Sequence, residues 1–153
     1  MRSGFWLGAL VPLLFASAVT AAEVAPMEVK FVDDIEIPES LTGKPGDPVQ
    51  GREWYAGRKL GNCLACHMTT DLKEQPFHGE VGPAMDGVAD RYEEPALRAI
   101  LVNSKQVFGD QTLMPGFYVI DPGARTAEKY QGKTILAAQQ IEDIIAYLKT
   151  LKE

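Results

Sequence analysis

Cysteine and histidine are scarce in this sequence, which holds only two of each among its 153 residues. Cys63 and Cys66 are three positions apart, so they cannot form the long-range disulfides that stabilise many small secreted proteins. A structural zinc site needs a second pair of ligands, which His78 alone does not supply. No alternation of strand and helix patterns surrounds the two cysteines, which disfavours a redox pair of the thioredoxin type. The close pair of cysteines therefore needs another explanation.

Positive charge is also in short supply. The chain has 15 lysines and arginines against 21 aspartates and glutamates, a formal net charge of -6. It has no cluster of basic residues interleaved with aromatic ones, so no nucleic acid partner is expected. The sequence also lacks an activated nucleophile, carboxylates paired at catalytic spacing and a phosphate-binding loop. We therefore expect no bond-making catalytic residue on this chain.

The one long apolar run lies at the beginning of the sequence. Arg2 precedes a nearly unbroken apolar stretch from Phe5 to Val19, and small residues lead up to Ala22. This order is typical of a secretory signal peptide, and we predict that residues 1–22 are removed by cleavage after Ala22 or Ala21. A membrane anchor would need about 20 apolar residues, more than this run provides. The mature chain is expected in the periplasm, without a membrane anchor.

Residues 63–67 read Cys-Leu-Ala-Cys-His, a pattern typical of covalent haem attachment. Thiols at positions i and i+3 of a helical turn face the same side, where they can reach two vinyl groups on one edge of a porphyrin. His67 follows at once and can bind the iron. Haem of the c type is attached outside the cytoplasm, so the motif and the export signal support each other. We predict one haem c, attached through Cys63 and Cys66 with His67 on the iron.

The sixth position on the iron has several possible occupants. Met114 is our choice, because it follows His67 at a distance of 47 residues in a loop broken by glycine and proline. His78 is an alternative ligand, and a vacant or exchangeable position is the third possibility. Met68 lies too close to His67 to reach the opposite face of the haem. Met85 is expected to pack against the haem as an apolar side chain.

A histidine that binds iron generally donates its other ring nitrogen to a carbonyl, which fixes the ring. We predict that Pro83 provides this carbonyl for His67. Ligation by His67 and Met114 raises the potential of haem iron and leaves no position for a substrate. Electron transfer is therefore the predicted function.

Three segments after the signal peptide read as helices. Residues 48–60 follow the cap Asp47, residues 92–107 begin with an acidic first turn, and residues 138–152 carry an apolar stripe. Residues 23–47 contain four prolines and predict an extended arm, which lies along the domain or a partner, or else is a loosely attached leader. The prediction is an all-α domain over residues 48–153, with its helices packed around one covalent haem.

The first and last of these helices are expected to cross. We predict that Tyr147 contacts Trp54 or Tyr55, and that the helices approach most closely at Gly57 or Ala56. Ala137 stands where a Ser or Thr would cap the last helix, so its first turn is expected to be poorly capped.

The residues of the haem motif and their surroundings also resemble known proteins. Over residues 48–152 the sequence resembles class I cytochromes c, with a helix before Cys63 to His67, then Gly82-Pro83, then Met114-Pro115, and a C-terminal helix. More narrowly, three stretches are similar to the SoxX family, which provides the monohaem subunit of the SoxAX cytochromes of bacterial sulfur oxidation. These stretches are residues 43–48, residues 61–67 and residues 77–83.

The resemblance implies the class I cytochrome c fold and a heterodimer with a SoxA-like cytochrome subunit, which has its own haem and a cysteine persulfide. Such complexes act as L-cysteine S-thiosulfotransferases that oxidatively couple thiosulfate to a cysteine of the SoxYZ carrier. The SoxX-like subunit passes the electrons to small downstream cytochromes. A free-standing periplasmic electron shuttle is the competing interpretation, and a haem-based ligand sensor is a second one.

Overall fold

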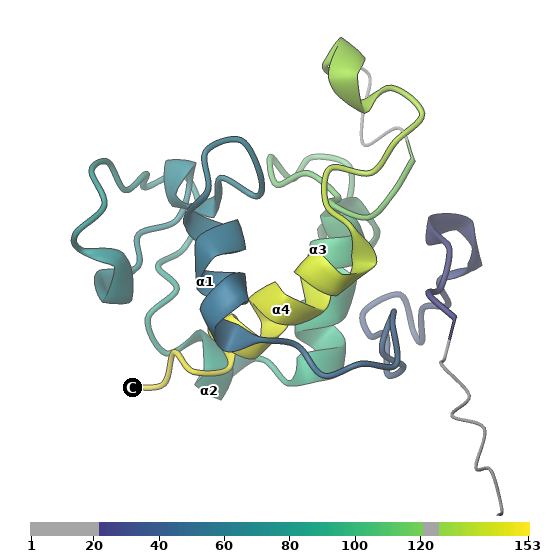
Figure 1. Cartoon of the computed structure of the whole chain (residues 1–153), viewed down its shortest axis with the longest axis horizontal. Helices are drawn as coiled ribbons and strands as arrows, with labels where there is room; N and C mark the ends of the chain where they lie inside the picture. Colours follow the sequence, from purple (N-terminus) through teal and green to yellow (C-terminus); the bar gives the residue numbers. More distant parts are fainter. Residues whose placement is uncertain (1–21, 121–125) are drawn as a thin grey trace, which may run out of the picture.

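The computed structural model describes residues 22–120 and 126–153, and in these parts the regular structure is helical (Figure 1). Within the same residues the only β pairing is an isolated bridge between Val32 and Glu36. The predicted all-α fold is confirmed, whereas the predicted signal peptide, residues 1–22, lies outside the described residues except for Ala22. The helices are α1 (Pro48–Ala56), α2 (Val88–Arg91), α3 (Glu94–Phe108) and α4 (Ala138–Leu148), with short 3-10 turns η1 (Pro26–Glu28), η2 (Cys63–Ala65), η3 (Thr70–Leu72) and η4 (Glu128–Tyr130).

Helix α1 begins where the sequence predicts but ends before the predicted residue 60. The Asp47 carboxylate accepts hydrogen bonds from the amides of Val49 and Gln50, and Pro48 occupies the first helical position, where its missing N–H costs nothing. The helix stops at Ala56, because Gly57 leaves the helical conformation and a turn follows. The expected extension to residue 60 is therefore wrong.

Helix α4 carries the predicted apolar stripe, and its members are buried: Ile141, Ile144, Ile145, Tyr147 and Leu148, followed by Leu151 just beyond the helix. The helix ends at Leu148, so the expected extension to residue 152 is wrong. Its start lacks a side-chain cap at Ala137, as expected. Gln140 compensates in a way not expected from the sequence: its side chain accepts a hydrogen bond from the Ala137 amide at 2.9 Å. This bond is one half of a capping box, so the first turn is better held than Ala137 alone predicts.

Helices α1 and α4 cross one another, as Figure 1 shows. Tyr55 and Tyr147 meet edge to face with 5.5 Å between their ring centres, which confirms one of the two contacts predicted for Tyr147. The helices approach most closely at Gly51, where a β-carbon would stand 1.9 Å from the carbonyl oxygen of Asp143. The expected closest approach at Gly57 or Ala56 is therefore wrong. The side chain of Asp143 also accepts a hydrogen bond from the Trp54 indole at 3.1 Å.

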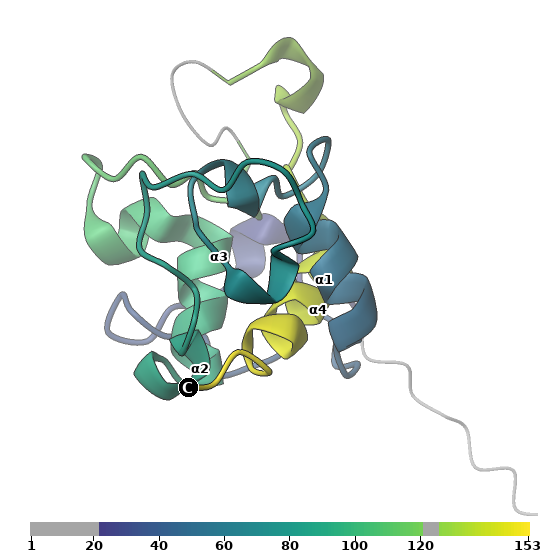
Figure 2. The ribbon, with the colours of Figure 1, turned by 90° about the vertical axis from the view of Figure 1, so that its left-hand side faces the viewer.

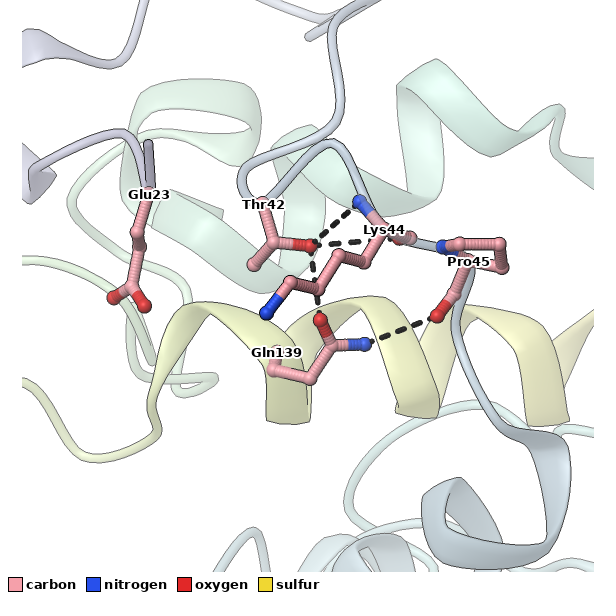
Figure 3. Close-up of a pocket in the computed structure, with 5 residues that line it drawn as sticks. All are labelled: Glu23, Thr42, Lys44, Pro45 and Gln139. Carbon is pink, nitrogen blue, oxygen red and sulfur yellow. Dashed lines mark hydrogen bonds between the residues drawn. The ribbon is translucent and has the colours of Figure 1, made fainter. Parts of the chain in front are cut away.

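The arm before α1 lies along the domain. The alternative, a loosely attached leader, is therefore excluded. Ile37 and Leu41 are buried at 3% and 1% exposure, although Met27 on η1 stays 89% exposed. The arm reaches α4 through Thr42, whose hydroxyl donates to the Gln139 side chain at 2.9 Å (Figure 3). Gln139 also donates to the Pro45 carbonyl at 3.2 Å.

A buried ion pair fastens the same arm to α3 and α4. Arg98 on α3 is 1% exposed, and its guanidinium donates two hydrogen bonds of 2.9 Å to the Glu142 carboxylate and a third to the Ile37 carbonyl. Glu142 in turn accepts from the Leu41 amide at 2.8 Å. Because each charged group is fully hydrogen-bonded, the pair is tolerated in the core and fixes where the arm lies.

Candidate haem-binding site

The two thiols lie on the 3-10 turn η2, directly after the turn that follows α1. Asn62 adopts a left-handed conformation with φ 51° and turns the chain into η2, where the amides of Cys66 and His67 both bond to the Cys63 carbonyl. Leu64 is buried and anchors the turn, while Cys66 is exposed and Cys63 is half-buried. Both thiols are free. The helical turn expected at this motif is present, in its tighter 3-10 form.

The two thiols differ in their surroundings. Burial raises the pKa of the Cys63 thiol to about 12, and the neighbouring Cys66 adds to the effect. Gly61 lies so close that a β-carbon there would stand 3.1 Å from the Cys63 sulfur. A glycine at this position therefore leaves room around the sulfur for a thioether bond.

The imidazole of His67 is held in one orientation. Its Nδ1 lies 2.7 Å from the Pro83 carbonyl oxygen, which is the carbonyl named from the sequence. A nitrogen facing a carbonyl must donate its proton, so the lone pair is on Nε2 and is available to a metal. Gly82 packs against the ring: a β-carbon at this position would stand 2.3 Å from its Cε1 atom. This close packing explains why a glycine precedes the proline.

His78, the alternative sixth ligand, has both ring nitrogens engaged within its own loop. Nδ1 accepts a hydrogen bond from the Thr69 amide at 3.2 Å, and Nε2 faces the Leu72 carbonyl at 3.1 Å. A histidine with these partners has no free lone pair for iron. In Figure 2 the teal chain that includes this loop lies in the foreground, in front of α1 and α3. The loop contains η3, whose Leu72 is fully buried.

Met114 lies in the loop after α3 and is half-buried against the hydrophobic core. Its carbonyl oxygen accepts a hydrogen bond from the Ser104 hydroxyl at 2.6 Å. The other methionines after the signal segment are Met27, Met68 and Met85; Met68 is 45% exposed, whereas Met85 is half-buried against the core. Met114 thus lies on a loop that is fastened to α3 through its backbone.

The donor set fits haem c better than a metal ion alone. Within residues 22–120 and 126–153, no group of three His, Cys, Asp or Glu side chains is arranged to hold a metal ion. Two free thiols on one turn, followed by an imidazole with its Nδ1 already engaged, are the groups that covalent haem requires. The site therefore contains the chemistry that the sequence motif predicts.

Sequence reasoning missed the residues that support the site. Ser104, Arg98 and Tyr118 are buried at 0%, 1% and 3% exposure, and of these Arg98 and Tyr118 lie within largely apolar stretches. A polar residue in an apolar stretch signals a buried hydrogen bond, but the sequence does not reveal its partner. The short helix α2, which follows Gly87 with φ 66°, was also missed because four residues are too few to show a helical period.

Two comparisons with known proteins bear on this site. The family described as cytochrome c matches residues 49–152, which include η2, the His67 loop and Met114. The chain belongs to the cytochrome c family. It accordingly carries covalently bound haem c, and its helices form the class I cytochrome c fold.

The second comparison is with solved structures. The chain is similar to a chain in the crystal structure of SoxXA from P. pantotrophus, with 42% sequence identity and a TM-score of 0.78. The match covers 86% of this chain and the whole of the solved one. This finding confirms the resemblance to the SoxX family. A search among curated protein sequences found no match.

Proposed function

We propose that this protein is the monohaem electron-transfer subunit of a SoxAX-type complex. In this proposal Cys63 and Cys66 form the thioether bonds, and His67 and Met114 are the iron ligands. The main support for this proposal is the free Nε2 lone pair of His67, which follows from the 2.7 Å contact between its Nδ1 and the Pro83 carbonyl. The engaged ring of His78 supports Met114 as the opposite ligand.

When bound, haem c supplies a one-electron Fe(III)/Fe(II) couple. The chain's own residues orient its ligands and shield them. Pro83 and Gly82 fix the His67 ring, and Ser104 holds the backbone of Met114. Because rigid ligands change little between redox states, such a site exchanges electrons with little rearrangement. No bond-making group of this chain takes part.

The partner of this subunit is a SoxA-like cytochrome with which it forms a heterodimer. The support is the 42% identity to a chain of a SoxXA complex. In the complex, the electrons released when thiosulfate is coupled to a cysteine of the SoxYZ carrier leave through this chain to a small downstream cytochrome. The free-standing shuttle predicts a protein that purifies alone.

The complex is expected in the periplasm, after removal of residues 1–22. In the residues that the structure describes, no helix has the length and apolar character to cross a membrane. The solved relative spans 86% of the 153 residues, or about 132, close to the 131 that remain after cleavage at Ala22. The proposed domains of the mature protein are the arm, residues 23–47, and the cytochrome domain, residues 48–153.

Purification of the native protein from its source tests the proposal. We expect it to co-elute with a second haem polypeptide, to retain haem on a denaturing gel, and to be reduced when thiosulfate and the SoxYZ carrier are added. Edman sequencing of the mature chain should begin at Glu23 or Ala22. A protein that elutes alone and stays oxidised with thiosulfate would instead be the free shuttle.

A further inference from the structure

Helix α3 is broken at the place where the Met114 loop contacts it. Asn103 has φ -149° and ψ 86°, values outside the helical region, although helix continues on both sides. No proline or glycine lies in this helix interior to impose the break, although Asn103 itself disfavours a helix interior because its side chain competes for backbone hydrogen bonds. The loop that packs at this point makes contacts that a regular helix would not allow.

The loop after Met114 bonds to α3 around this break. The Phe117 amide donates to the Leu101 carbonyl at 3.0 Å, and the Tyr118 amide donates to the Val102 carbonyl at 3.2 Å. A regular helix keeps its carbonyls for amides four residues later, whereas carbonyls beside a break can accept from other donors. Two backbone hydrogen bonds thus join the loop to the helix just before the break.

A third hydrogen bond joins them just after the break. Ser104 is 0% exposed and its hydroxyl donates to the Met114 carbonyl at 2.6 Å. A serine inside a helix usually bonds to its own helix, so this one is redirected toward the loop. Gly116 allows the close approach: a β-carbon there would stand 3.0 Å from the Val102 carbonyl oxygen and 2.8 Å from a methyl group of Val119.

The arm contacts the Met114 loop on the side that faces away from α3. The Tyr118 hydroxyl shares its single proton between the Val24 carbonyl at 2.8 Å and the Glu23 carboxylate at 3.1 Å. Burial, followed by the hydrogen bond to Glu23, raises the pKa of Tyr118 to about 12, so this hydroxyl stays a donor at neutral pH. Residues 114–118 are thus held between the broken helix and the arm.

We propose that the break of α3 at Asn103 is a dock for the Met114 loop, in which Ser104 is a positioning residue that keeps the Met114 thioether on the iron. The inference rests on the proposed ligand role of Met114 and adds the residue that enforces it. Ser104 does not touch the iron. It acts through the backbone of Met114, so that losing its hydroxyl loosens the loop and favours any competing ligand.

The test measures how well imidazole competes with Met114 for the ferric iron of the purified holoprotein. Removal of one buried hydroxyl donor leaves the Met114 carbonyl unsatisfied, and we expect Ser104→Ala to raise the apparent imidazole affinity about ten-fold. Thr150→Val is the control for the loss of a side-chain hydrogen bond elsewhere, because the hydroxyl of the exposed Thr150 donates to the Tyr147 carbonyl at 2.7 Å in another part of the fold. We expect the control to stay within about two-fold of the unmodified protein.

A second variant covers the case in which Ser104→Ala does not accumulate. Gly116→Ala keeps every hydrogen-bond donor and pushes the loop away from Val102, so it should raise imidazole affinity in the same direction. Imidazole affinities unchanged in both variants would overturn the dock. An equal rise in Thr150→Val would also overturn it, since the effect would then reflect general destabilisation.

Met114→Ala separates this inference from the ligand assignment on which it rests. The ferric absorption band from methionine-to-iron charge transfer should be present in the unmodified protein and absent from Met114→Ala. If the band persists without Met114, the ligand assignment fails and the dock fails with it. If Met114 carries the band while Ser104→Ala and Gly116→Ala bind imidazole normally, only the dock is wrong.

Discussion

The α1–α4 crossing and the Met114 loop are held in different ways. At the crossing, backbones approach until Gly51 has no space for a β-carbon beside Asp143, and apolar side chains fill the interface. The segment from Met114 to Tyr118 is joined to α3 by three hydrogen bonds, and although Phe117 and Tyr118 are buried, Met114 itself is only half-buried. Packing of the first kind is difficult to change without unfolding, whereas the second kind can open locally. The α1–α4 crossing thus forms a rigid scaffold, whereas the loop that carries the proposed ligand Met114 can move.

The largest effect is expected from the buried ion pair beside the crossing. Arg98→Met leaves the Glu142 carboxylate buried without its partner, and we expect a loss of about 3–5 kcal/mol in the free energy of unfolding. Denaturant titration followed by far-UV circular dichroism measures it. Adding Glu142→Leu to the same variant should recover much of the loss. If the double variant is no more stable than Arg98→Met, an unpaired charge is not the cause.

A smaller loss is expected at the crossing itself. Gly51→Ala must push α1 away from the Asp143 carbonyl, and we expect it to cost about 2–3 kcal/mol. Val49→Ala, at a 66% exposed position of the same helix, provides the control and should change stability by less than about 0.5 kcal/mol. Equal stability of the two variants in thermal unfolding would show that the backbones do not touch at Gly51.

A weaker effect concerns pH. The hydrogen bond from Arg52 lowers the pKa of Asp71, assisted by the Tyr147 hydroxyl and partly opposed by desolvation. A carboxyl with a lowered folded-state pKa contributes stability above its unfolded pKa, near 4, and loses it as the pH falls through the folded value. Stability of the unmodified protein should therefore decline below about pH 4 more steeply than that of Asp71→Asn.

Parallel stability-pH curves in this acidic range would contradict the role assigned to Asp71. Measurements at two salt concentrations add a check, because Arg52 and Asp71 are 38% and 46% exposed and their attraction is screened by ions. The pH effect should consequently shrink at high salt, whereas the effect of Gly51→Ala should not.

The sequence predicted the helices α1 and α4 better than the contacts between elements. The apolar stripe of α4 and the cap Asp47 identified two helices, because both signals are local. The site of closest approach was wrong, since small residues at Gly51 and Gly57 look alike until the crossing angle is known. Ser104 and Arg98 could not be assigned partners, because their hydrogen bonds join segments far apart in the chain. The break at Asn103 could not be predicted either, because an asparagine within a helical pattern is usually tolerated.

For the site, the motif at residues 63–67 and the prolyl carbonyl at Pro83 could be named because spacing dictates the chemistry. The choice between Met114 and His78 needed the structure, which engages both ring nitrogens of His78. That Met114 is the ligand in the holoprotein stays a prediction.

The contrast between scaffold and ligand loop can be measured in one titration. Ferric holoprotein is unfolded with guanidinium chloride while the methionine-to-iron charge-transfer band and the far-UV helix signal are recorded together. We expect the band to disappear at a lower denaturant concentration than the helix signal, because the Met114 loop opens before α1 and α4 separate. Coincident transitions, or a native ferric protein without the band, would contradict it.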